Sequence, residues 1–418
     1  MKTPKKISYG QCSFERLRTE NYVYVDKTRF IEMLENEPNS YHFLIRPRKF
    51  GKSLFLSTLR CYYDICYADK FDEYFGDLYI GKNPTQKRNS YLVIEFNFSG
   101  LDTSSVETFQ DSFKKSIKNS IEFFLTEHKF ILADYDENLK ELRKCNNIHP
   151  LLSFAFNIIS SFGRKAYITI DDYDQYVSNL IAGTEQNKEL SGAFGIVRNF
   201  YEILKNYTAD VIDTIFMTGV MPIVFDNLTS GFNITTNLSN DLRYNDIYGF
   251  TEEEVEFLIE ECGIDRTKMT IDLKSLFSGY LFHQNAKNKL YNPSMVLYFL
   301  SKSSIADNEI EKIVDDNFIA NFEIVKILLD KPENNNQLDK IFKSGTVPTI
   351  INKRFSIDDF WRLEFLSLLY YVGLVTFDDD NERGISYLKI PNDAIKLYLN
   401  RQKRKNIQKL TIKNQKLK

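Results

Sequence analysis

The sequence has few residues of the kinds that build covalent or metal-bound scaffolds. Its 418 residues include only five cysteines and four histidines, with no CxxC pair, HExxH motif or Cys/His cluster. We therefore predict scattered free thiols in a reducing compartment and no zinc site. The absence of a GxSxG motif argues against the nucleophile elbow of a serine hydrolase.

Long apolar stretches are also missing. The N-terminal sequence MKTPKKIS is basic, but no apolar segment follows it, so we expect no signal peptide. The most apolar run, 365–377, has 13 residues and is too short to span a membrane. These features predict an intracellular protein of the cytoplasm with no membrane partner.

Neither sign of charge dominates the chain. Lys and Arg number 54 and Asp and Glu 57, a net charge of −3. This balance excludes a wholly basic nucleic-acid-binding surface but not a local basic patch. A hydrophobic content of 43% is ordinary for a globular protein and excludes general disorder. At this length we expect two or three domains.

Apolar segments of strand length alternate with helical patterns over the first 250 residues. Such alternation is typical of βαβ units, so it predicts an α/β fold with a parallel sheet. Helices are expected over 52–67, in two or three segments within 103–162, and over roughly 186–206. Strands are expected at 41–45, 91–98, 166–170 and 211–217, with a short fifth at 247–250 and a β-like segment at 22–25.

The pattern becomes mainly helical after residue 250. Residues 251–254 (TEEE) form the capping-box pattern that opens a helix. Further on, a helix followed by short strands at 375–377 and 387–390 predicts a winged-helix-like unit. The tail 401–418 carries eight Lys or Arg residues and no acid.

The segment between the first strand and its helix, RPRKFGKS at 46–53, ends like a phosphate-binding loop. Such a loop directs backbone N–H groups at the phosphates, its lysine reaches the β- and γ-phosphates, and its hydroxyl binds Mg²⁺. The helix N-terminus that follows also favours anions. Arg46 stands where the first glycine is usual, and the alternative is a basic turn that binds nothing. The nucleotide is assigned to Pro47, Arg48, Lys49, Phe50, Gly51, Lys52 and Ser53, with Ser53 also a Mg²⁺ ligand.

A second strand ends in acids, in the sequence AYITIDD at 166–172. A carboxylate at a strand end can hold Mg²⁺, and the next acid can orient the attacking water. We predict Asp171 as a Mg²⁺ ligand, and Asp172 and Lys52 as catalytic residues. The alternative is an ordinary strand end, since two acids after an apolar strand are common.

Two further polar residues are candidates for contact with the γ-phosphate. Thr218, at the tip of the next strand, is placed like a nucleotide sensor, although strand-end threonines also form turns. Arg243, within SNDLRYND, is a candidate arginine finger acting on its own site or on that of another copy. The alternative for Arg243 is a plain surface arginine.

These motifs together resemble the AAA-ATPase-like family of bacterial and fungal proteins. Its members carry a loop close to RPRRFGKS, an acidic strand end IDEYD and a TGV…SGFN…GFTEEEV block. The matching segments here are 46–53, IDDYD at 170–174, TGV at 218–220, SGFN at 230–233 and GFTEEEV at 249–255, together with YVDKT at 24–28, YNP at 291–293 and IPN at 390–392.

The resemblance spans residues 7–398 and implies a P-loop core of the additional-strand class with strand order 5-1-4-3-2, which binds ATP and Mg²⁺. It makes Arg46 a family trait and implies that 24–28 lines the adenine pocket. Asp172 stands where members usually have Glu, which bears on the rate of hydrolysis more than on binding. Many members continue into a PD-(D/E)xK nuclease domain, but the C-terminal part here has no Asp…Glu-x-Lys pattern, so we expect no nuclease activity.

Five parts are predicted from these patterns. They are an N-terminal segment (1–40), a P-loop ATPase core (41–250), a helical lid region (251–350), a winged-helix-like unit (351–400) and a basic tail (401–418).

The leading functional prediction is a Mg²⁺-dependent ATP hydrolase whose nucleotide state moves the helical region. One alternative is a nucleotide-binding switch or scaffold with little turnover. Another is a nucleic-acid-binding module in which the winged-helix-like unit and the tail contact phosphates. The tail is otherwise a solvated, disordered end, and a protein partner or a homo-oligomer stays open.

Overall fold

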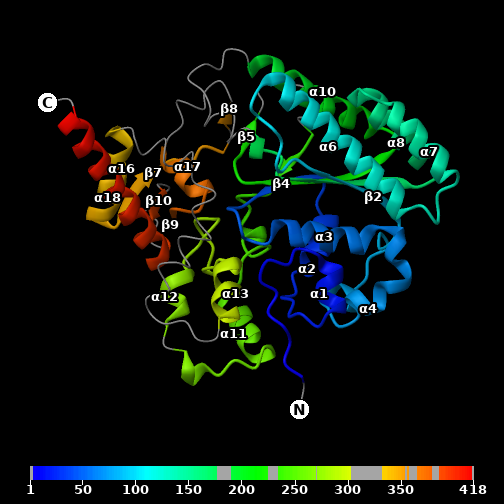
Figure 1. Ribbon diagram of the computed structural model, residues 1–418. Helices are drawn as coiled ribbons and strands as arrows, with labels where there is room; N and C mark the ends of the chain where they lie inside the picture. Colours follow the sequence, from blue (N-terminus) through cyan, green and yellow to red (C-terminus); the bar gives the residue numbers. More distant parts are fainter. Residues whose placement is uncertain are drawn as a thin grey trace.

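The centre of the protein is a five-stranded parallel sheet (Figure 1). The computed structural model describes residues 3–176, 190–224, 234–269, 271–302, 332–353, 355–356, 365–378 and 386–416. The strands are β1 (Tyr41–Ile45), β2 (Tyr91–Asn97), β3 (Lys165–Asp171), β4 (Ile212–Gly219) and β6 (Thr236–Asn237). The sheet order β6-β1-β4-β3-β2 confirms the predicted α/β class and the order 5-1-4-3-2.

The register of the strands brings their carboxyl ends to one edge of the sheet. Ile45 of β1 pairs with Gly219 of β4, and Asp171 ends β3 on the other side of β4. These strands are buried along almost their whole length, as expected for a parallel sheet covered on both faces. Continuous apolar runs therefore made them predictable from the sequence.

The fifth strand was predicted at the wrong place. The edge strand is β6, which pairs with His42 and Phe43 of β1. Residues 247–250 instead form a turn, in which Phe250 makes a single bridge to Tyr291. They are apolar because they pack inside the protein, whereas the polar edge strand of two residues carries no such signal.

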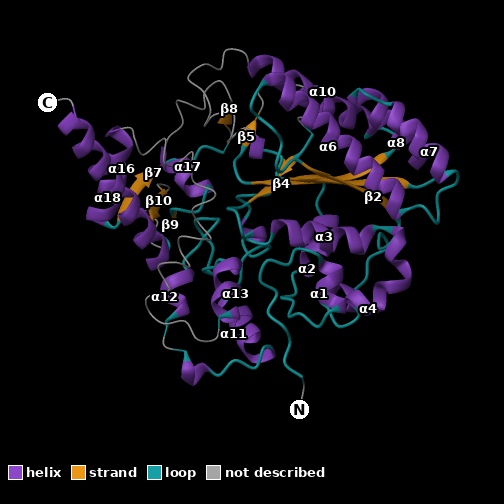
Figure 2. Cartoon of the chain, viewed as in Figure 1, coloured by secondary structure: helices purple, strands orange, loops and turns teal. Residues whose placement is uncertain are grey.

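Helices cover both faces of the sheet (Figure 2). One face is covered by α6 (Val106–Glu127), α8 (Ile148–Ser161) and α10 (Leu190–Tyr207), with α7 (Tyr135–Lys144) beside α6. The other face is covered by α3 (Lys52–Tyr63). Beyond it lie α1 (Phe14–Thr19), α2 (Arg29–Glu35), α4 (Phe71–Phe75), α5 (Tyr79–Lys82) and the 3₁₀ helix η1 (Ile65–Lys70).

Two N-terminal boundaries differ from the prediction. Helix α3 ends at Tyr63 instead of residue 67, because Asp64 is extended and its side chain caps η1 by accepting from the Cys66 N–H. The β-like segment 22–25 joins no named strand, and only Tyr22 makes a bridge, to Lys6. Val23 and Val25 are buried all the same, which explains the strand-like pattern.

The C-terminal half begins with helices packed beside the N-terminal segment (Figure 1). The predicted capping box is present, since Thr251 and Glu254 exchange both hydrogen bonds at the start of α11. The elements are the 3₁₀ helix η3 (Leu242–Tyr244), α11 (Glu252–Glu261), the 3₁₀ helix η4 (Arg266–Lys268), α12 (Leu273–Phe277) and α13 (Pro293–Ser301).

The last part of the chain contains a small antiparallel sheet of order β7-β10-β9. Its strands are β7 (Thr346–Thr349), β9 (Thr376–Phe377) and β10 (Ser386–Lys389), and a separate pair joins β5 (Ile223–Val224) to β8 (Phe355–Ser356). The helices are α16 (Pro332–Ser344), α17 (Phe365–Tyr371) and α18 (Asp393–Lys416). The predicted helix and hairpin are thus present as α17 and the β9–β10 pair. The basic tail is helical to Lys416 as part of α18, which differs from a disordered end.

Among the described residues, no helix combines the length and the apolar character needed to cross a membrane.

Candidate functional site

The segment 46–51 forms a tight loop between β1 and α3. Lys49 and Gly51 adopt left-handed conformations, with φ of 68° and 98°. Gly51 is the residue before the first turn of α3, so a side chain there would be strained although no atom blocks it. The first N–H groups of α3 have no partner within the helix, and such groups can bind an anion.

Lys52, the first residue of α3, is buried inside the loop. Its Nζ donates hydrogen bonds to the carbonyl oxygens of Arg46 (3.1 Å) and Pro47 (3.2 Å). Burial lowers the pKa of Lys52, and the nearby carboxylates of Asp172 and Asp171 offset part of that effect. A buried ammonium held only by carbonyl oxygens is well placed to accept an anionic partner.

The two predicted Mg²⁺ ligands lie in direct contact. The Ser53 hydroxyl donates to Asp171 Oδ2 at 2.6 Å, joining the start of α3 to the end of β3. Burial, together with neighbouring Asp172, raises the pKa of Asp171 to about 6. A hydroxyl and a buried carboxylate are hard oxygen donors, and a cation here would relieve the cost of burying the negative charge. The residues present therefore fit Mg²⁺.

Asp172 follows at the cavity wall. Its φ of 50° is left-handed, and its N–H donates to Asp171 Oδ1 at 3.0 Å. The side chain is partly exposed and lines the same cavity as the loop. The turn thus separates the two acids, with Asp171 directed at Ser53 and Asp172 facing the open space.

Asp174 is a third acid of this turn and was assigned no role from the sequence. Its carboxylate is buried and accepts the N–H groups of Val220 (3.0 Å) and Met221 (2.7 Å). Gly219 has to be glycine here, because a Cβ would clash with the Asp174 carboxylate and the Tyr173 ring. Asp174 therefore fixes the turn after β3 to the turn after β4. In the sequence, only the match of 170–174 to the family pattern IDEYD pointed to Asp174.

Two predicted phosphate contacts lie elsewhere in the structure. The Thr218 hydroxyl is fully buried and donates to the Leu44 carbonyl oxygen at 2.6 Å, and Thr218 does not line the cavity. Arg243, in η3, pairs with Glu37 (2.7 Å) and Asp241 (2.6 Å) and is also absent from the cavity wall. Neither residue therefore lines this cavity, and a contact of Thr218 or Arg243 with a nucleotide, in this chain or in another copy, stays a prediction.

The structure gives a physical reason for Arg46 at the first loop position. Its buried guanidinium donates to the carbonyl oxygens of Ile45, Ser239 and Tyr244, each at 2.8 Å. It also lies over the Phe282 ring, 4.3 Å from the centroid, and burial lowers its pKa to about 10. The side chain thus anchors the base of the loop instead of contacting a phosphate.

Phe50 forms a second anchor on the same side. Its ring is buried in T-shaped contacts with Tyr280 (5.0 Å) and Phe282 (5.3 Å), and its carbonyl oxygen accepts from the Gly249 N–H at 3.2 Å. Pro47, which does not line the cavity, packs against Gly373 so closely that a Cβ there would lie 2.9 Å from it. Of the seven loop residues assigned to the nucleotide, Pro47 and Phe50 thus contact the C-terminal region, although Phe50 also lines the cavity.

A cavity of about 530 Å³ opens beside the loop. Its lining includes the loop residues from Arg48 to Ser53 and Asp172. The N-terminal segment, α11 and α13 contribute the rest, which includes the apolar side chains of Val23, Leu258 and Leu297. The predicted wall 24–28 contributes Tyr24, Val25 and Lys27, but no motif pointed to the stretch 8–12 or to the two helices as parts of the wall.

A parallel 5-1-4-3-2 sheet with a lysine- and serine-bearing loop at its carboxyl edge defines a P-loop-like ATPase core. The family model described as predicted AAA-ATPase matches residues 8–229, and the chain belongs to that family. Family membership implies nucleotide binding.

Two individual proteins are also similar to the chain. An uncharacterised protein in the vnfD 5′ region of Azotobacter chroococcum mcd 1 is 27% identical over 307 residues, which are 71% of this chain and 52% of the relative. The chain thus spans about half the length of this curated relative. A solved Walker-type ATPase of Pyrococcus abyssi aligns over 94% of this chain and 97% of its own, with 13% identity and a TM-score of 0.49.

Proposed function

We propose that this protein binds Mg²⁺-ATP in the cavity beside 46–53 and hydrolyses it. The observation that carries the proposal is the contact between Ser53 and Asp171, next to the buried ammonium of Lys52. Binding of Mg²⁺-triphosphate requires a lysine and a hydroxyl at a helix N-terminus, with a carboxylate nearby. The apolar side chains of the lining, such as Val23 and Leu258, would contact the base.

Each residue would have a separate task. Lys52 and the N–H groups of the loop would neutralise the phosphates once the lysine leaves the carbonyl oxygens that it now contacts. Ser53 and Asp171 would hold Mg²⁺, which supplies charge neutralisation between the β- and γ-phosphates. Asp172, facing the cavity, would orient the attacking water.

The nucleotide state would move the C-terminal region through the loop. Arg46 and Phe50, at the two ends of the loop, both contact Phe282. Any change in loop conformation on binding phosphate therefore displaces two side chains that pack on one C-terminal ring. This contact supports the predicted coupling between the core and the helices beyond residue 251.

The primary test is Lys52→Ala, measured by ATP binding in the presence of Mg²⁺. Loss of a charge-assisted contact is expected to weaken binding by about 10- to 100-fold. Lys140→Ala is the matched control, because Lys140 lies exposed on α7 and far along the chain from the loop. Unchanged affinity in a folded Lys52→Ala protein would reject the site.

A second candidate function is a nucleotide-binding scaffold with little turnover. It is favoured by Asp172, which is one methylene shorter than the Glu usual in the family. If the acid is only too short, Asp172→Glu should raise the rate of ATP hydrolysis while leaving affinity similar, and Asp172→Asn should abolish turnover. If both the wild type and Asp172→Glu bind ATP but release no phosphate, the scaffold is correct and hydrolysis is not.

A further inference from the structure

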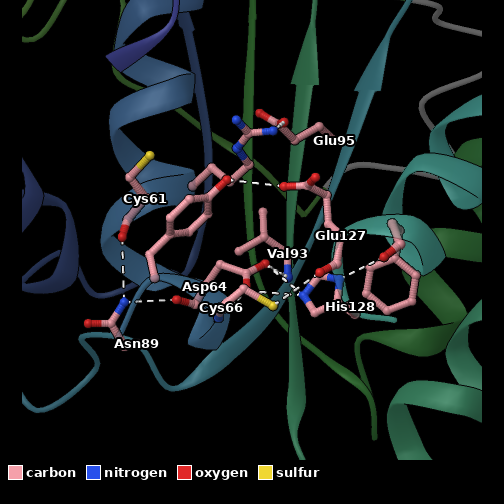
Figure 3. Close-up of polar contacts among 11 residues, drawn as sticks. Cys61, Asp64, Cys66, Asn89, Val93, Glu95, Glu127 and His128 are labelled. Atoms are coloured by element: carbon pink, nitrogen blue, oxygen red, sulfur yellow. Dashed lines mark hydrogen bonds and ion pairs between the residues drawn. The ribbon is translucent and has the colours of Figure 1, made fainter. Parts of the chain in front are cut away.

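A second polar cluster lies just after the C-terminal end of α3, at the opposite end of that helix from the phosphate-binding loop. Figure 3 shows the side chains of this cluster. Asp64, Cys66 and His128 each offer one ligand atom, and these atoms lie within 4.8 Å of one another. Asp64 and His128 are buried and Cys66 is partly buried. They come from the junction between α3 and η1 and from the residue after α6.

The imidazole of His128 is oriented like that of a metal ligand. Nδ1 lies 2.7 Å from the carbonyl oxygen of Phe124, so this nitrogen donates to the backbone. The other nitrogen, Nε2, faces the cluster and lies 3.0 Å from both carboxylate oxygens of Asp64. Histidines that bind metals commonly donate their second ring N–H to a backbone carbonyl in this way.

The carboxylate of Asp64 is also held in place. Oδ1 accepts the Cys66 N–H at 2.9 Å and Oδ2 accepts the Val93 N–H at 3.0 Å. A carboxylate has about four lone-pair positions, so each oxygen keeps one for the cluster. The backbone of η1 and β2 therefore fixes the carboxylate before any ion binds.

The thiol completes a mixed donor set. Cys66 Sγ makes a long contact of 3.6 Å with the Glu127 carbonyl oxygen and also interacts with the side chain of His128. Next to it is a cavity of about 10 Å³, which is lined by all three residues and corresponds to about one small ion or water molecule.

We propose that Asp64, Cys66 and His128 bind one Zn²⁺ ion, with water in the fourth position. Thiolate, imidazole and carboxylate together suit zinc, whereas Mg²⁺ and Ca²⁺ prefer oxygen donors alone. On binding, Zn²⁺ replaces the proton on Nε2 and the proton on Sγ, and both are released to solvent. The sequence predicted no zinc site because His128, which follows α6, is far along the chain from the other two residues.

The ion would act as a structural link. It would join the start of η1 to the residue that follows α6, across the first part of β2. Because α3 leads from the phosphate-binding loop to Asp64, the site would fix the far end of that helix. The proposal does not depend on ATP binding.

The test is Zn²⁺ binding to chelator-treated full-length protein in excess Mg²⁺, measured by competition with a chromogenic chelator and by elemental analysis. We expect one equivalent of Zn²⁺ in the wild type, and at least a 10-fold loss of affinity in Cys66→Ser and His128→Gln. Cys145→Ser is the matched control, since Cys145 is also a partly buried thiol with a contact to a backbone carbonyl. Lys52→Ala should bind Zn²⁺ like the wild type, which separates this site from the nucleotide site.

Two further results complete the test. With Co²⁺ in place of Zn²⁺, a thiolate-to-metal absorption band should appear in the wild type and be lost in Cys66→Ser. If His128→Gln fails to fold, the comparison of Cys66→Ser with Cys145→Ser decides alone. An absence of stoichiometric Zn²⁺, or equal affinity in Cys66→Ser, would overturn the proposal.

Discussion

At the scale of single residues, buried charges define the site. Lys52, Asp171 and Asp174 are all largely removed from solvent, within one region at the carboxyl edge of the sheet. Burial raises the pKa of Asp174 to about 6, although the N–H groups of Met221 and Val220 oppose that shift. All three groups are costly to bury in their charged forms, and groups of this kind cluster at functional sites.

Asp174 makes the stability of the protein depend on pH. Its pKa is about 6 in the folded state against an ordinary value of 3.8, so the folded state takes up the proton first as the pH falls. The cost of the buried charge is thus fully present above pH 6 and is relieved towards pH 4, by up to about 3 kcal/mol.

The Asp174→Asn variant should lack the rise in stability that protonation of Asp174 gives as the pH falls. Between pH 7 and pH 5, its unfolding free energy in urea should rise less than that of the wild type. The control is Asp136→Asn, at an exposed position of α7, which should follow the wild type. Parallel pH curves for the wild type and Asp174→Asn would contradict the assignment.

At the scale of secondary structure elements, the start of α11 connects three parts of the cavity wall. The Glu254 side chain accepts the Thr251 N–H at 2.8 Å as part of the capping box. The same carboxylate pairs with Lys27 Nζ at 2.7 Å, and Lys27 also donates to the Asp246 carbonyl oxygen. One helix N-terminus therefore joins the N-terminal segment to the turn before α11.

Thr251→Ala should remove one of the two cap hydrogen bonds. The expected loss is about 1 kcal/mol of unfolding free energy, which can be measured by urea denaturation. Thr251→Ser keeps the hydroxyl and should retain most of the stability. Equal stability of the Ala and Ser variants would show that the cap contributes nothing.

At the scale of the whole molecule, the ATPase core and the C-terminal region meet at the back of the phosphate-binding loop. Phe282 is the shared contact of Arg46 and Phe50, and Tyr370 donates to its carbonyl oxygen at 3.1 Å. Phe282 thus lies between the loop and α17. On the proposed function, a change in the loop would be passed to the C-terminal region through this residue.

Phe282→Leu should uncouple the two halves without blocking the site. We expect Phe282→Leu to bind ATP like the wild type. A non-hydrolysable ATP analogue should, however, protect residues 273–300 from hydrogen exchange less in Phe282→Leu than in the wild type. Phe299→Leu is the control, because Phe299 is also buried but packs on Phe277, outside the cavity wall and the loop contacts. Identical protection in Phe282→Leu and the wild type would exclude this route.

The sequence by itself determined the elements whose signal is local. Strand 41–45, the loop after it and the start of α3 follow from a buried apolar run, a GKS pattern and a helical period, and they lie where they were predicted. The meeting of Ser53 with Asp171 was also predictable, because parallel strands bring their carboxyl ends to one edge. The capping box at Thr251 could be predicted from the four residues 251–254 alone.

Only the tertiary structure decided features that depend on contacts between distant parts of the chain. The direction of the Arg46 side chain depends on carbonyl oxygens almost 200 residues away. Thr218 has its hydroxyl satisfied by the neighbouring strand, and the polar edge strand β6 is defined by its pairing with β1. Hydrophobic periodicity reports which side of an element is buried but not what it is buried against. The apolar side chains that line the cavity and the Asp64–Cys66–His128 cluster could therefore be found only in the folded protein.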